Sequence, residues 1–160
     1  MLFSKTVSGS IQCALDTASC VLDGQSSRRV INVKGTGGQT LSFRGLTFKD
    51  GKTDYGGGLY INTGAIVNIL LCIFSSCRAT TGNGGGAIYL GNNGATVNVF
   101  GSRFTGNTAE SGDGKDVFNN GGTMIFHSSC PSPYSSNTPT QGKLERACVE
   151  QSDSIPSNYN

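Results

Sequence analysis

The stretch Gly56-Gly57-Gly58-Leu59-Tyr60-Ile61 returns, slightly changed, as Gly84-Gly85-Gly86-Ala87-Ile88-Tyr89-Leu90. In the same way, Ala65-Ile66-Val67-Asn68-Ile69 returns as Ala95-Thr96-Val97-Asn98-Val99. A phenylalanine accompanies the pattern at positions 48, 74 and 104, which are 26 and 30 residues apart. A repeat of this length indicates supersecondary units that stack on one another.

Short strands are predicted within each unit. Segments such as 66–69 and 96–99 alternate with a period of two, which is the period of a β-strand. Between them lie Gly, Asn and Asp, which tolerate the tight corners that bulkier residues resist. No helical spacing of apolar residues is found between Leu41 and Phe126. The sequence therefore predicts an all-β protein, a right-handed single-stranded parallel β-helix of about four to five turns.

Stacking turns equivalent positions into columns that repeat about every 4.8 Å, the spacing between strands. One turn cannot bury its apolar face alone, so each turn depends on its neighbours. Thr40, Ile66, Thr96 and Thr123 are expected to point outward. The predicted core ladder consists of Leu22, Phe48, Phe74 and Phe104 in one column, Leu41, Val67 and Val97 in a second, and Phe43, Ile69 and Val99 in a third; Met124 is expected to continue the second column and Phe126 the third.

Six cysteines indicate disulfides and therefore an oxidising compartment, either the extracellular space and cell surface or an organelle lumen such as the thylakoid lumen. Sequence proximity favours the pairs Cys13–Cys20, Cys72–Cys77 and Cys130–Cys148, although fifteen connectivities are formally possible. Cys20 and Cys72 fall in one column two turns apart, about 10 Å, beyond disulfide reach. Residues 1–7 lack the apolar core of an export signal, so we expect a mature form, a fragment or an excised piece.

The chain is expected to divide into a β-helix domain at 1–127 and a C-terminal tail at 128–160. The tail is rich in Pro, Ser, Thr and Asn, a composition that builds no core of its own. A short helix at 143–150, held by a Cys130–Cys148 bridge, is compatible with its sequence. We expect this tail to cover an open edge of the solenoid or to contact a partner.

Composition excludes several classes of function. The net charge is +2 and charged residues make up 14% of the chain, which does not favour nucleic acid or an anionic membrane as a partner. The longest apolar run, 66–74, is too short to span a bilayer. With a single histidine and no Cys-x-x-Cys pair, neither a metal nor another cofactor is expected.

The candidates for catalysis are few. Cleavage of a glycosidic bond needs two facing carboxylates, and His127 has no nucleophile in a recognisable motif nearby. The segment 112–118 resembles one calcium-binding nonapeptide, but only one copy is present, and the Thr/Ser/Asn rows are too irregular for an ice-binding surface. We interpret the corner carboxylates as solvated turn residues; they are Asp50, Asp54, Glu110, Asp113 and Asp116.

Gly85-Gly86-Ala87-Ile88, followed by Phe104-Thr105-Gly106-Asn107, resembles the paired GGAI and FxxN motifs of polymorphic outer membrane protein repeats. More broadly, the chain resembles pectin-lyase-like right-handed parallel β-helix proteins. The resemblance covers about 41–126 and implies the fold. Such repeats are found in surface adhesins and in exported proteins, and no catalytic residue of the family carries over to this sequence.

The functional hypothesis is a non-enzymatic exported module that is structural or adhesive, or an accessory subunit that stabilises a larger assembly. Its protein partners would be met through the tail or through a face of the solenoid. One alternative is a polysaccharide-binding or polysaccharide-cleaving β-helix, a remnant of a lyase or hydrolase. Another is a lumenal accessory subunit of a membrane complex, including a photosynthetic one.

Overall fold

The computed structural model describes residues 2–3, 8–14, 20–34, 37–81, 84–91, 93–110 and 114–127. Within these ranges all the regular structure is β and no helix is found. The strands are β1 (Leu2–Phe3), β2 (Gly9–Gln12), β3 (Cys20–Asp23), β4 (Ile31–Lys34), β5 (Thr40–Arg44), β6 (Leu46–Lys49), β7 (Lys52–Thr53), β8 (Leu59–Asn62), β9 (Ile66–Leu70), β10 (Ile73–Ser75), β11 (Arg78–Ala79), β12 (Ile88–Leu90), β13 (Thr96–Phe100), β14 (Arg103–Thr105), β15 (Thr108–Ala109), β16 (Val117–Asn119) and β17 (Thr123–Phe126).

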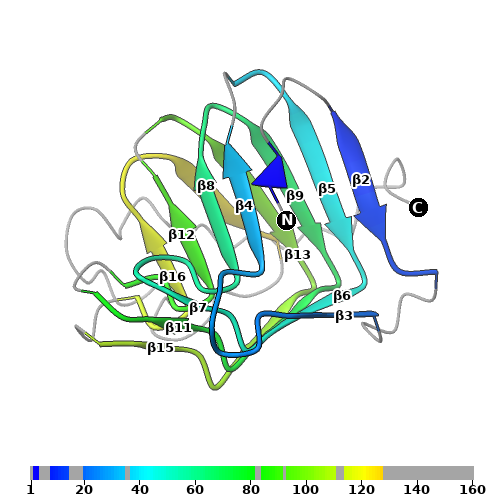
Figure 1. Ribbon diagram of the computed structural model, residues 1–160. Coiled ribbons are helices and arrows are strands. Elements are labelled where there is room, and N and C mark those ends of the chain that lie inside the picture. Colours follow the sequence, from blue (N-terminus) through cyan, green and yellow to red (C-terminus); the bar gives the residue numbers. More distant parts are fainter. Residues whose placement is uncertain are drawn as a thin grey trace.

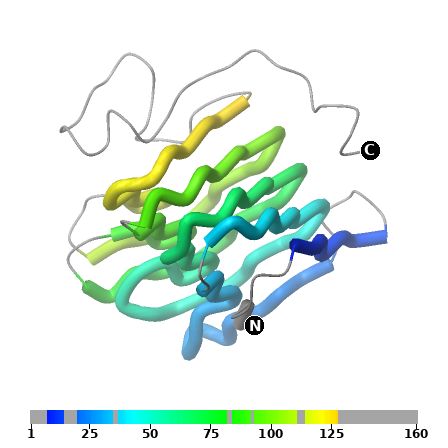
Figure 2. Tube along the Cα trace, turned by 90° about the horizontal axis from the view of Figure 1, so that it is seen from above, coloured from blue at the N-terminus to red at the C-terminus, as the bar shows by residue number. Residues whose placement is uncertain are grey.

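The strands form four parallel sheets that the chain visits in a fixed order. Sheet A has the order β1-β4-β8-β12-β16, sheet B β17-β13-β9-β5-β2, sheet C β14-β10-β6-β3 and sheet D β15-β11-β7. After each passage through the sheets the chain returns to sheet A one rung further along (Figure 1). Figure 2 shows the rungs stacked in sequence order from the N-terminal to the C-terminal end of the coil. The protein is a parallel β-solenoid of about four turns, as the repeat predicts.

The predicted columns lie inside the tube. Phe48, Phe74 and Phe104 pair in register on sheet C, with ring centroids 4.5 Å and 5.1 Å apart and nearly parallel planes. On sheet B the two predicted columns end with Met124 and Phe126 in the last rung, as expected. The buried ladder residues are Phe48, Phe74, Leu41, Val67, Val97, Phe43, Ile69 and Val99. Leu22 and Phe104 lie on edge strands and are partly buried against this core.

The corners between sheets repeat a left-handed backbone conformation. Between sheets B and C it is adopted by Gly45, Leu71 and Gly101, with φ of 62°, 51° and 52°. Between sheets C and D it is adopted by Asp50 and Ser76, with φ of 49° and 54°, and by Gly106. Because side chains disfavour this conformation, it persists at Leu71 only because the rungs on both sides hold the corner in place.

The glycine triplets lie where the backbone enters sheet A and neighbouring segments approach closely. A Cβ atom on Gly57 would lie 2.5 Å from the carbonyl oxygen of Gly51. On the equivalent Gly86 it would meet the carbonyl oxygens of Thr108 and Lys115. The triplets are therefore required by contact between backbones, and the Gly-Gly-Ala-Ile motif has a structural explanation.

The predictions for 128–160, which are the tail, the helix at 143–150 and the Cys130–Cys148 bridge, lie outside the described residues. The proposed division at residue 127 coincides with the end of the described solenoid, but the structure does not test it. The segment 112–118 that resembles a calcium repeat is described only from Gly114 onward.

We predict that Phe74→Ala lowers the free energy of unfolding by about 3–5 kcal/mol, because it removes the ring that is stacked between two others. Urea denaturation followed by circular dichroism measures this change. Val21→Ala is the matched control, since Val21 lies on sheet C with 53% of its side chain exposed, and a change within about 0.5 kcal/mol is expected. Equal losses in the two variants would contradict the stacked interior.

Candidate functional site

Within the described ranges, the predicted corner carboxylates contact neighbouring residues or neighbouring rungs. Asp50 forms an ion pair with its neighbour Lys49, with Nζ 3.2 Å from Oδ2. Asp54 accepts a hydrogen bond from the Oγ1 of Thr80 at 3.3 Å. Glu110 pairs with the guanidinium of Arg78 on sheet D, and Asp113 lies outside the described residues. These contacts join neighbouring residues or neighbouring rungs, which supports their interpretation as turn residues.

Among the described corner carboxylates, Asp116 has a distinct environment. Burial raises the pKa of Asp116, while hydrogen bonding from Asn107 and the nearby charge of Lys115 act in the opposite direction. The Nδ2 of Asn107 donates to Oδ1 of Asp116 at 2.9 Å and to the carbonyl oxygen of Phe74 at 3.1 Å. The Oδ1 of Asn107 accepts the backbone N–H of Cys77 at 2.9 Å. The asparagine of the Phe-x-x-Asn motif is therefore a buried corner brace between rungs.

We predict that Asn107→Ala destabilises the protein by about 1–3 kcal/mol, because a buried N–H and a buried carbonyl oxygen lose their partner. Chemical denaturation of the full chain measures the loss. Asn93→Ala serves as the control, since Asn93 is exposed and its side chain donates to Asn62 of the neighbouring rung. A change in Asn107→Ala no larger than that in the control would show that the brace contributes little.

The most distinctive surface feature is a column of aromatic rings on the outward side of sheet A. Tyr60, Tyr89 and Phe118 occupy one register position on β8, β12 and β16. Their rings stack at 5.4 Å and 5.6 Å, with interplanar angles of 6° and 11°. Tyr55 packs over Tyr89 at 5.1 Å in a tilted arrangement. We call these four residues the aromatic strip.

Arg29 anchors the strip at its N-terminal end. Its guanidinium carbon lies 4.4 Å from the centroid of the Tyr60 ring, within the range of a cation–π contact. The same group donates to the carbonyl oxygens of Tyr55 and Gly56, the shortest of these bonds being 2.6 Å. Burial lowers the pKa of Arg29, and the nearby Asp54 favours its charged form. Arg29 thus fixes the loop that holds Tyr55 against Tyr89.

The stacking decides what the strip can bind. Tyr89 is only 7% exposed, whereas Tyr55, Tyr60 and Phe118 are partly exposed. Since the ring faces of Tyr60 and Tyr89 are covered by neighbours, the strip offers mainly ring edges and phenol hydroxyl groups. Sequence reasoning missed this surface, although the signal was present: Tyr60 and Tyr89 hold the same place in the two glycine-rich repeats.

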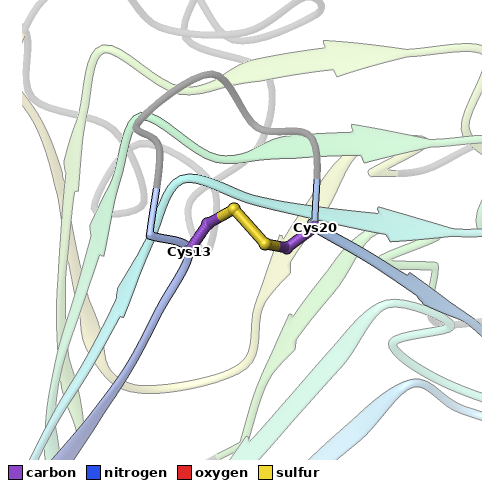
Figure 3. Close-up of a disulfide and its surroundings, with 2 residues drawn as sticks. All are labelled: Cys13 and Cys20. Carbon is purple, nitrogen blue, oxygen red and sulfur yellow. A yellow bond between two sulfur atoms is a disulfide. The ribbon is translucent and has the colours of Figure 1, made fainter.

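One predicted disulfide is present and another is not. Cys13 and Cys20 are bridged, with Cα atoms 5.6 Å apart, and join the end of β2 to the start of β3 (Figure 3). The predicted Cys72–Cys77 bridge is wrong, because both residues are free buried thiols. The extended strand β10 separates them, so their backbones lie well beyond disulfide reach. Cys130 and Cys148 lie outside the described residues.

The two free thiols are structural. The Sγ of Cys72 lies 3.3 Å from the carbonyl oxygen of Leu70, and that of Cys77 lies 3.6 Å from the carbonyl oxygen of Phe48. Burial raises the pKa of each to about 11. A thiol that stays protonated and enclosed is a poor nucleophile.

We predict that Cys72 and Cys77 resist alkylation by iodoacetamide in the native chain at about pH 8 and react in denaturant. At that pH only about one thiol in a thousand would be ionised, from a pKa of about 11. Mass spectrometry of tryptic peptides identifies the modified positions. Native labelling of Cys72 or Cys77 at the rate measured in urea would contradict their burial.

His127, the last of the catalytic candidates, makes an aromatic contact. The imidazole of His127 stacks on Phe100 at 4.0 Å, outside the interior core cluster. Across the described ranges, no group of three or more His, Cys, Asp or Glu residues is placed to hold a metal ion. Nor does the part of the chain that the structure describes contain a helix able to cross a membrane.

Comparison with known proteins returned no matching family model, no matching curated protein and no matching solved structure. The pairing of the strands shows the parallel β-solenoid. The resemblance to pectin-lyase-like proteins and to polymorphic outer membrane protein repeats stays a prediction.

Proposed function

We propose that this protein is a non-enzymatic, exported β-solenoid module that makes protein contacts within a larger assembly, either as a structural or adhesive unit or as an accessory subunit. The aromatic strip carries this proposal. Tyrosine is enriched at protein interfaces because it combines apolar area with a hydroxyl group and has few rotatable bonds. On a rigid sheet, those side chains are already ordered before a partner binds.

The arrangement of the strip fits a flat protein surface better than a small ligand. Its rings are held by stacking and by the Arg29 contact, so they form a fixed ridge on sheet A. The Cys13–Cys20 bridge is compatible with an oxidising compartment and supports export only weakly. In this proposal the compartment that holds the protein can also be an organelle lumen, including that of a photosynthetic membrane.

Chemical cross-linking of the native protein to its neighbours, in the cells or extract that contain it, tests this function. Lys34 ends β4 and Lys115 precedes β16 on sheet A, whereas Lys49 ends β6 on sheet C, and all three are exposed. We expect intermolecular cross-links to form through Lys34 or Lys115. A partner attached only through Lys49 would contradict the assignment of sheet A.

Variants sharpen that test. Replacing Tyr60 and Phe118 by Ser should reduce co-purification of the cross-linked partner by about tenfold or more, since aromatic residues often dominate interface energy. The loss of ring stacking should cost only about 0.5–1.5 kcal/mol for each pair, and thermal melting checks that the chain still folds. Val21→Ser, an exposed change on sheet C, is the control and should leave the partner bound.

A polysaccharide-cleaving function is the second candidate, and the raised pKa of Asp116 favours it, because a general acid needs such a shift. Cleavage would also require a second carboxylate that faces Asp116 across the substrate. Incubation with pectin, alginate and related glycans decides the point. We expect no cleavage; turnover that Asp50→Asn or Asp116→Asn abolishes would overturn the first proposal.

A further inference from the structure

The end of the solenoid at β16 and β17 is covered, although no described rung lies beyond it. The inward side chains of these strands, Val117, Met124 and Phe126, are 0%, 0% and 1% exposed. At the opposite end, Ile11 and Leu22 point inward from the edge strands of sheets B and C and remain partly exposed. A terminal rung without a cover would leave one side of its inward residues in water.

A second, independent observation comes from the outward face of sheet B. Leu70 and Phe100 have the opposite parity to the core residues Ile69 and Val99, and they do not belong to the interior cluster. They are nevertheless only 1% and 4% exposed. In register, Leu70 lies between Arg44 and Phe100, and the ring of His127 stacks on Phe100, so these neighbours shield the flanks of the two side chains.

The burial extends over the middle and the C-terminal end of β9, since the outward Asn68 is also 0% exposed. Ile66 lies on the same strand and points the same way as Leu70, yet 46% of it is exposed. Among the described strands, the main neighbours of β9 are β5 and β13, which lie beside it in sheet B and not over it. What covers Leu70 and Phe100 therefore passes over the C-terminal ends of β9 and β13.

We propose that residues 128–160 of this chain cover both places, as an intramolecular cap on the end of the solenoid and on sheet B around Leu70 and Phe100. The segment begins directly after His127, whose ring stacks on Phe100 at the same end and on the same face. Its 33 residues are long enough to span both sites, since an extended residue reaches about 3.3–3.6 Å.

The composition of the segment suits a cap. It carries a few separated apolar residues within a mainly polar sequence, among them Tyr134, Leu144, Val149 and Ile155. Such a segment buries a few side chains against the solenoid and presents polar groups to water, as terminal caps of repeat proteins do. The cap also blocks those strand edges of β16 and β17 that pair with no described strand. It thereby prevents a second solenoid from joining end to end.

Limited proteolysis of the full chain tests the cap. Trypsin cleaves after Lys143 and Arg146 within the segment, and the free peptide 128–160 gives the rate for an undocked chain. We expect cleavage of the full chain to be slower than that of the peptide by about tenfold or more, because proteolysis follows the population of the open form. Leu70→Asp and Phe100→Asp should restore rapid cleavage, whereas Ile66→Asp, the matched control, should not.

Three results would overturn the proposal. The first is a wild-type cleavage rate equal to that of the free peptide. The second is protection that rises with protein concentration together with dimers in sedimentation, which would make a second copy the occupant. The third is equal release by Ile66→Asp. Circular dichroism checks the folding of each variant, and the comparison of wild type with peptide decides the outcome even where a variant does not fold.

Discussion

Every feature of this molecule depends on the register of parallel strands from one rung to the next. Because each rung hydrogen-bonds to the next with equivalent residues opposite one another, a side chain repeated in the sequence becomes a stack in space. The interior phenylalanine column and the exterior aromatic strip have the same origin. Inside the tube the stack excludes water, and outside it creates a surface.

Keeping that register constrains the backbone at the corners. At the entrance to sheet A, the backbones of adjacent segments approach so closely that only glycine fits at Gly57 and Gly86. At the next corners, a left-handed conformation recurs in rung after rung, even at Leu71 and Ser76. Where the repeat offers an asparagine, at Asn107, its side chain satisfies backbone groups of the neighbouring rung. Glycine and asparagine thus mark some, but not all, of the positions at which the coil turns.

The sequence predicted the repeat, the parallel coil and the columns, because those follow from spacing and alternation alone. It was wrong about Cys72 and Cys77, since sequence proximity ignores that β10 is extended and carries its two ends apart. It also missed the aromatic strip: the repeat itself carries the signal for Tyr60 on Tyr89, whereas the contacts of Tyr55 and Arg29 cross from a loop to another rung and have no such signal. Proximity along the chain and proximity across rungs are different quantities in a solenoid.

The amino-acid sequence by itself therefore determined the period, the strand pattern and the identity of the buried columns, since each rests on a local alternation that every rung repeats. Only the tertiary structure decided which outward side chains meet, which thiols remain free and which outward apolar residues, such as Leu70 and Phe100, are buried. The reason is physical: these properties depend on what lies over a face or beside a corner, and neither is encoded in the spacing of the repeat.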